Sequence, residues 1–117
     1  MKIFIYDKCD TCRKALKFLL ERGLLAVTVP IRETPPTVAE LNRMLGYVGE
    51  LKRLFNTSGL DYKALNMKER LPKLTEAEAL ALLAANGNLV KRPFLLTGTG
   101  GTTGFKQAEW EALVAGE

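Results

Sequence analysis

The chain opens with a short apolar run, Ile3 to Tyr6, that leads almost directly into an amphipathic helical pattern. Apolar residues recur at helical spacing from about Asp10 to Arg22, and Gly23 stands where a left-handed helix stop is expected. A second apolar run follows over Leu24 to Ile31. Two strands joined by a crossover helix are parallel, and the crossover is right-handed in nearly all sheets. The beginning of the chain therefore predicts an α/β fold built on a parallel strand pair.

The middle of the chain, about residues 35–90, is predicted to be a block of helices. Thr37 and Thr75 each stand three residues before a glutamate, which is the capping-box pattern that opens a helix. The helix after Thr37 is expected to stop at Gly46. Shorter helical pieces are expected over Gly49 to Phe55 and Leu60 to Leu71.

The last part of the chain predicts a hairpin followed by a helix. Phe94 to Thr97 forms a third strand, and a glycine-rich turn leads into a fourth strand at about Thr102 to Phe105. A final helix is expected from about Gln107. Pro30 lies inside the second strand and cannot donate to a sheet ladder, so that strand is expected at the edge of the sheet.

These elements together predict a thioredoxin-like fold: a four-stranded mixed sheet flanked by helices, with the helical insert between strands 2 and 3. We expect one domain over residues 1–117. The N-terminus reaches Asp7 and Lys8 too early for a signal peptide, and no apolar segment approaches the roughly 18 residues needed to span a bilayer. A cytoplasmic protein with no membrane association is therefore expected.

Charge and residue counts exclude several kinds of chemistry. The net charge of +4 is dispersed, with no basic run typical of DNA binding. The chain has no histidine and only two cysteines, so Cys-His nucleophile pairs and zinc sites of the Cys₄ or Cys₂His₂ type are excluded within one chain. No metal site and no bound cofactor are expected.

The two cysteines, Cys9 and Cys12, are the candidate catalytic residues. They bracket Asp10-Thr11 at the start of the first helix, where free backbone N–H groups and the helix dipole stabilise an anion. A thiolate is favoured at such a position, so Cys9 is expected to be the nucleophile. Cys12, one turn later, is close enough to attack a mixed disulfide at Cys9 and release the partner.

Four stretches of the chain carry a specific combination of motifs. They are Tyr6 to Ala15, Leu54 to Gly59 with Tyr62 soon after, Asn86 to Pro93, and Gly104-Phe105 before the last helix. Together they resemble the ArsC-like family, which comprises glutaredoxin-coupled arsenate reductases, Spx-type regulators and uncharacterised thiol-reductase relatives. The resemblance covers essentially the whole chain.

The resemblance implies a site and a reaction. In the arsenate reductases a cysteine thiolate attacks arsenate, arginines hold the oxyanion, and glutathione and glutaredoxin release arsenite. The matching nucleophile here is Cys9, and Arg92 matches the arginine that precedes a cis-proline, Pro93. The residues that match the other oxyanion- or thiolate-binding positions are Thr11, Arg13, Lys52 and Lys106, with lysine standing at two arginine positions.

The resemblance also leaves alternatives open. Arsenate reductases of this fold usually have serine at the position of Cys12, whereas Spx-type regulators use a C-x-x-C pair as a redox switch and bind RNA polymerase. We expect a thiol-dependent oxidoreductase that acts on a small oxyanion or on a protein or low-molecular-weight disulfide. An external thiol (glutathione, glutaredoxin or thioredoxin) is the expected reductant. The alternatives are an Spx-type regulator and a metal-delivery protein that uses both thiolates.

Overall fold

The computed structural model describes residues 1–116 and is built on a four-stranded sheet of order β2-β1-β3-β4. The strands are β1 (Lys2–Ile5), β2 (Val27–Pro30), β3 (Phe94–Leu96) and β4 (Gly101–Thr103). β1 and β2 are parallel, while β3 is antiparallel to both β1 and β4. The predicted mixed sheet is confirmed, and β2, which contains Pro30, lies at its edge.

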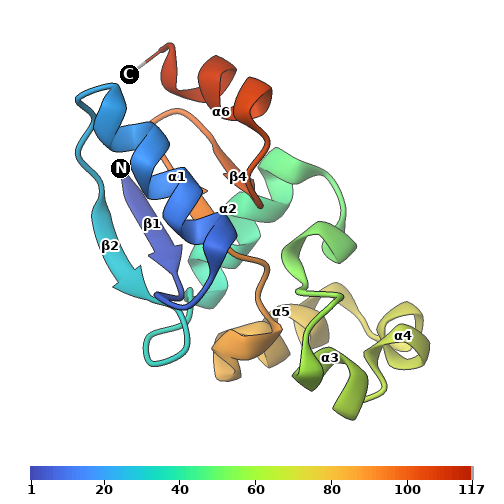
Figure 1. The fold of residues 1–117 in the computed structure, drawn as a ribbon. Coiled ribbons are helices and arrows are strands. Elements are labelled where there is room, and N and C mark those ends of the chain that lie inside the picture. Colours follow the sequence, from blue (N-terminus) through green and yellow to red (C-terminus); the bar gives the residue numbers. More distant parts are fainter. Residues whose placement is uncertain (117) are drawn as a thin grey trace.

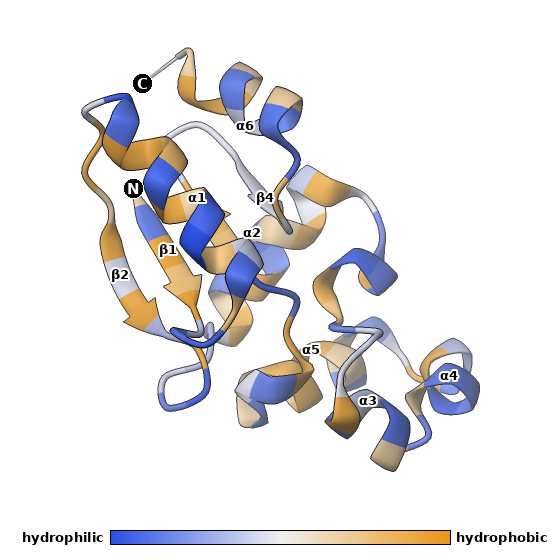
Figure 2. Ribbon diagram, in the orientation of Figure 1, coloured by the Kyte–Doolittle hydropathy of each residue, from blue (hydrophilic) through white to orange (hydrophobic). Residues whose placement is uncertain are grey.

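The two faces of the sheet bury different helices (Figure 1). Successive residues of a strand point to opposite faces, and Ile3 belongs to one apolar core while Phe4 belongs to the other. The helices α1 (Asp10–Glu21) and α6 (Gln107–Val114) cover the Ile3 face. Helices of the insert cover the Phe4 face. Figure 2 shows hydrophobic and hydrophilic residues alternating around α1, as a helix packed on one side requires.

The insert between β2 and β3 is helical, as predicted. Its elements are α2 (Val38–Val48), the 3₁₀ turn η1 (Leu51–Leu54), α3 (Leu60–Ala64), α4 (Met67–Arg70), η2 (Leu71–Lys73), α5 (Glu76–Ala85) and η3 (Gly87–Leu89). Both predicted capping boxes are present, at Thr37 and at Thr75. The middle of the insert meets its end where Phe55 bridges to Val90, so the segments that follow η1 and η3 lie side by side.

Several predicted boundaries differ from the structure. α2 continues through Gly46 and ends at Gly49, which has the left-handed conformation, with φ 87°. The second strand is shorter than predicted and begins at Val27. The fourth strand ends at Thr103: Gly104 has φ 72°, and although its N–H donates to the Pro93 carbonyl in register with the ladder, Pro93 has no N–H to return the bond. The predicted domain end at residue 117 lies outside the described residues.

Over residues 1–116, every helix is too short or too polar to cross a membrane.

Candidate active site: a cysteine pair beside a basic cleft

Cys9 is the N-cap residue of α1. Its backbone is extended, with φ −100° and ψ 117°, and its Sγ accepts the N–H of Cys12 at 3.4 Å. Its own N–H donates to the carbonyl of Tyr6 at 3.1 Å. The side chain is partly exposed. The structure therefore places the Cys9 sulfur at the helix N-terminus, where backbone dipoles favour an anion and where a substrate can reach it.

Cys12 lies directly behind Cys9 and is only 1% exposed. Burial raises the pKa of Cys12 to about 12, and the adjacent Cys9 acts in the same direction. The backbone of Tyr6 and the charge of Arg92 oppose this shift without cancelling it. Cys12 is therefore a protonated thiol at neutral pH. Both cysteines are reduced in the structure.

Arg92 approaches the cysteine pair from the segment before β3. The Arg92–Pro93 peptide bond is cis, as the family resemblance implied. The guanidinium carbon lies 5.1 Å from the ring centroid of Tyr6. Its Nη1 atom is buried and has no hydrogen-bond partner within residues 1–116. A buried donor without a partner is costly, and an anionic ligand is the kind of group that would satisfy it.

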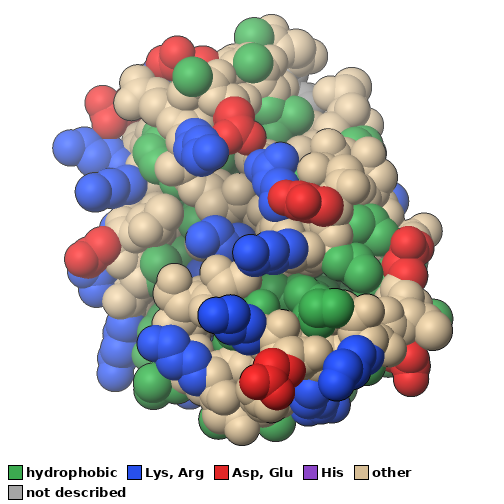
Figure 3. All heavy atoms as spheres, turned by 90° about the vertical axis from the view of Figure 1, so that its right-hand side faces the viewer, with side chains coloured by type: hydrophobic (Ala, Val, Ile, Leu, Met, Phe, Trp, Pro, Cys, Tyr) green, Lys and Arg blue, Asp and Glu red, His purple; other side chains and the backbone are tan. Residues whose placement is uncertain are grey.

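A cleft of about 530 Å³ opens beside the cysteine pair. Five cations line it, and we call it the basic cleft: Lys52, Arg53, Lys91, Arg92 and Lys106. Among the described lining residues Glu50 is the acid, and Thr11 joins the cleft to the cysteine segment. Cys9 itself is not part of the lining. Figure 3, which views the right-hand side of Figure 1, shows Lys and Arg side chains gathered across the middle of that face.

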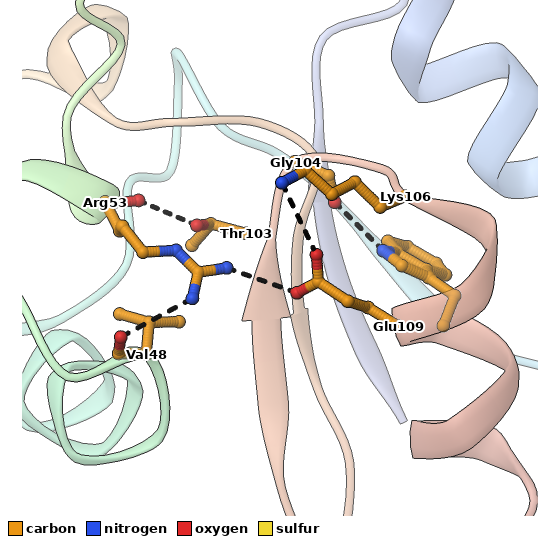
Figure 4. A network of polar contacts seen from close by, with 7 residues as sticks. Val48, Arg53, Thr103, Gly104, Lys106 and Glu109 are labelled. Atoms are coloured by element: carbon orange, nitrogen blue, oxygen red, sulfur yellow. Dashed lines mark hydrogen bonds and ion pairs between the residues drawn. The ribbon is translucent and has the colours of Figure 1, made fainter.

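Arg53 is fixed on one wall of the basic cleft (Figure 4). Its guanidinium contacts Glu109 at 3.3 Å and the Val48 carbonyl at 3.5 Å, while its own carbonyl accepts the Thr103 hydroxyl at 2.7 Å. Lys106 lies 3.9 Å from the same Glu109 carboxylate. These exposed pairs orient the two cations without removing them from solvent, so both remain available to a ligand.

Both the sequence and the fold of the chain are similar to those of known proteins. The ArsC family profile matches residues 4–113. The chain belongs to the ArsC family. This ArsC-family protein is 44% identical over 112 residues, 95% of each chain, to the uncharacterized protein YusI of Bacillus subtilis. It is 31% identical over 98 residues, 82% of each chain, to an arsenate reductase of Neisseria meningitidis.

Solved structures of ArsC-family relatives have the same fold. An ArsC family related protein from Bacteroides fragilis superimposes with a TM-score of 0.91 at 43% identity, covering 97% of this chain and 98% of that one. A protein described as a possible arsenate reductase from Streptococcus mutans gives a TM-score of 0.88 at 36% identity, covering 97% and 96%. These relatives confirm the predicted fold and the predicted family.

The structure brings most of the predicted ArsC-family site residues together. Thr11, Lys52, Arg92 and Lys106 line the basic cleft, and Pro93 is buried behind Arg92. Arg13 is not part of the lining. It is exposed on the outer side of α1, where it pairs with Asp10 at 2.8 Å and donates to the Asp7 carbonyl.

Two lining cations, Arg53 and Lys91, were absent from the predicted site of this ArsC-family protein. Each is the sequence neighbour of a predicted residue, and adjacent positions in a loop do not reveal which side chain points inward. Lys91 reaches the cleft beside Gly104, where a Cβ atom would lie 3.3 Å from the Lys91 Cε. Within residues 1–116, no group of three Cys, Asp or Glu side chains is placed to hold a metal.

Proposed function

We propose that this ArsC-family protein is a cytoplasmic thiol-dependent reductase, with Cys9 as the nucleophile and Cys12 as the resolving thiol. The observation that carries the proposal is the position of Cys9: a partly exposed sulfur at the N-cap of α1, adjacent to a cleft lined by five cations. The substrate is anionic, because the cleft charges and the orphan Nη1 of Arg92 favour a negative ligand.

The first step forms a mixed disulfide. The Cys9 thiolate attacks one sulfur of a substrate disulfide, forming a bond from Cys9 Sγ to that sulfur and breaking the substrate S–S bond. The departing sulfur leaves with the electron pair and takes a proton from water. Arg92 stabilises negative charge close to the reacting sulfurs, since its charge acts on Cys12, the neighbour of Cys9.

The second step uses Cys12. Its thiol loses a proton to water, and its sulfur attacks Cys9 Sγ, forming the Cys9–Cys12 disulfide and releasing the second substrate thiolate. The hydrogen bond and the charge of Cys9 both raise the pKa of Cys12. Both effects change when Cys9 Sγ is bonded to the substrate sulfur in the mixed disulfide. Burial remains, so resolution is the slower step at neutral pH.

An external thiol completes the cycle. Reduction of the substrate leaves Cys9 and Cys12 oxidised as a disulfide. Two electrons from glutathione, glutaredoxin or thioredoxin thiols reduce this disulfide back to the dithiol form. No bound cofactor takes part in this scheme.

Turnover of a disulfide substrate by two variants tests the proposal. Cys9→Ser should abolish reductase activity, whereas Cys12→Ser should retain mixed-disulfide formation and lose the second step. Full activity in the Cys9→Ser variant would overturn the proposed mechanism. Lys17→Met is a matched control on the same helix, because Lys17 is exposed, lies eight residues after Cys9 and is outside the cleft.

A further inference from the structure

The basic cleft lies beside the nucleophile and not around it. Five cations line the cleft, yet Cys9 does not, and Thr11 is the residue of the cysteine segment that reaches it. Arg92 acts on Cys12 by its charge, so a ligand that contacts all these cations extends along the cleft from the neighbourhood of the cysteine pair. Such contacts act on a remote part of a substrate and position its reacting atom.

From this placement we propose that the preferred substrate is a disulfide carried on an acidic polypeptide segment, whose carboxylates occupy the cleft while its sulfur reaches Cys9. This inference rests on the proposed function and specifies its substrate class. The polypeptide is long enough to reach from the cleft to Cys9, whereas a free oxyanion is not.

The size of the cleft favours such an extended ligand. A water molecule in the liquid takes up about 30 Å³, so an anion with four oxygens needs roughly 100 Å³. The cleft offers about 530 Å³. This lies in the range of sites that hold ligands of many atoms. Phe55 and Phe105 also line the cleft and provide apolar contact for the stems of side chains.

The cation types favour separate carboxylates over one compact oxyanion. Lys52, Lys91 and Lys106 come from three different segments of the chain, η1 and the residues before β3 and before α6. Lysine is a mobile point charge and lacks the planar fork that suits a single tetrahedral oxyanion. Lys52 and Lys91 form no ion pair with any residue from 1 to 116, so neither charge is already neutralised by the protein.

A set of matched peptide disulfides tests the proposal on the full chain. One peptide has glutamates flanking its cysteine, the second has glutamines, and the third has lysines; arsenate is a fourth substrate. We expect the KM for the acidic peptide to be about tenfold lower than for the neutral one, because two exposed ion pairs are worth about that factor together. The lysine peptide should be the poorest of the three.

A double variant then identifies the cleft as the cause. Lys52→Met with Lys91→Met should raise the KM for the acidic peptide about tenfold and should change the KM for the neutral peptide much less. Lys68→Met is the matched control, since Lys68 is exposed on α4 and outside the cleft. Equal KM values for acidic and neutral peptides would overturn the proposal, as would arsenate turnover more efficient than that of the acidic peptide.

Failure of the proposed function gives a different result. If no disulfide is turned over, the acidic peptide with serine in place of its cysteine still tests the cleft by calorimetric titration. Binding that is lost in the double lysine variant supports the recognition of acidic segments, and absence of binding to the wild-type chain contradicts it.

Discussion

The guanidinium of Arg92 lies against the aromatic ring of Tyr6, 5.1 Å from its centroid. Tyr6 also contacts both cysteines through its backbone: its carbonyl accepts the N–H of Cys9, and its backbone lowers the pKa of Cys12 against the effect of burial. The guanidinium of Arg32 lies 4.9 Å from the same ring. Tyr6 therefore connects the position of Arg92 to the geometry of the cysteine pair.

Replacing Tyr6 should separate the ring contact from the backbone contacts. Tyr6→Leu should raise the KM for an anionic substrate about fivefold, because a cation–π contact contributes about 1 kcal/mol to the placement of Arg92. Tyr6→Phe keeps the ring and should restore the wild-type KM. Steady-state kinetics measure both values, and a Phe variant as poor as Leu would show that the ring does not position Arg92.

Replacing Arg92 should affect substrate binding more strongly. Its buried Nη1 has no partner in the described chain, so a bound anion gains a hydrogen bond that lysine cannot reproduce with the same geometry. Arg92→Lys should raise the KM for anionic substrates about tenfold, a loss of about 1.4 kcal/mol. Thermal unfolding is the control: a large fall in Tm would assign Arg92 a structural role instead.

The rate of resolution should depend steeply on pH. Burial raises the pKa of Cys12 to about 12 in the reduced protein, and it persists in the mixed disulfide, so the Cys12 thiolate is a minor species at neutral pH. As long as the pH stays below the pKa, the fraction of Cys12 thiolate increases about tenfold for each unit by which the pH is raised. The rate of attack on Cys9 should increase with it. Rapid acid quenching of a preformed Cys9 mixed disulfide measures this rate from pH 6 to 8. A rate that is constant over this range would contradict a buried, protonated resolving thiol.

The start of α2 should contribute stability that is lost in acid. Partial burial opposes ionisation of Glu40, but the Lys2 ammonium at 2.8 Å and the Thr37 backbone lower its pKa below the usual value of 4.5. The unfolded chain therefore binds a proton at a higher pH than the folded chain. This contribution is present above pH 4.5 and disappears as the pH falls through the lowered folded pKa.

Chemical denaturation of Glu40→Gln tests this pH dependence. The variant should be less stable than wild type by about 1 kcal/mol at pH 7, a modest value because Lys2 is partly exposed. The difference should shrink as the pH falls below 4. Glu33→Gln is the control, since Glu33 is exposed and forms no ion pair with residues 1–116. An equal loss at pH 7 and in acid would rule out the Glu40 charge as its source.

Local chemistry made much of this fold predictable. The capping boxes at Thr37 and Thr75 fix helix starts through contacts within one turn, and Pro30 restricts its strand to an edge. The end of α2 was mispredicted because Gly46 and Gly49 are both acceptable stops by residue type. Only the backbone conformation, left-handed at Gly49, distinguishes them.

The nucleophile was predictable and the cleft only partly so. Cys9 could be assigned because a strand leads directly into a helix at that point of the sequence. The cleft brings together residues far apart in the chain, so the inward direction of Arg53 and Lys91 depends on packing between η1, β3 and β4. Arg13 was assigned to the site by family resemblance, but Asp10 pairs with it on the exposed side of the helix.

The most direct test of Cys9 as the nucleophile is a trapping experiment with the Cys12→Ser variant. The variant is incubated with an acidic peptide disulfide, and the intact protein and its proteolytic fragments are weighed by mass spectrometry. We predict a stable adduct of one peptide on Cys9, which Cys12 of the wild-type protein would release as the intramolecular disulfide forms. An unmodified Cys9 under conditions where the wild-type protein reduces the same peptide would contradict the mechanism.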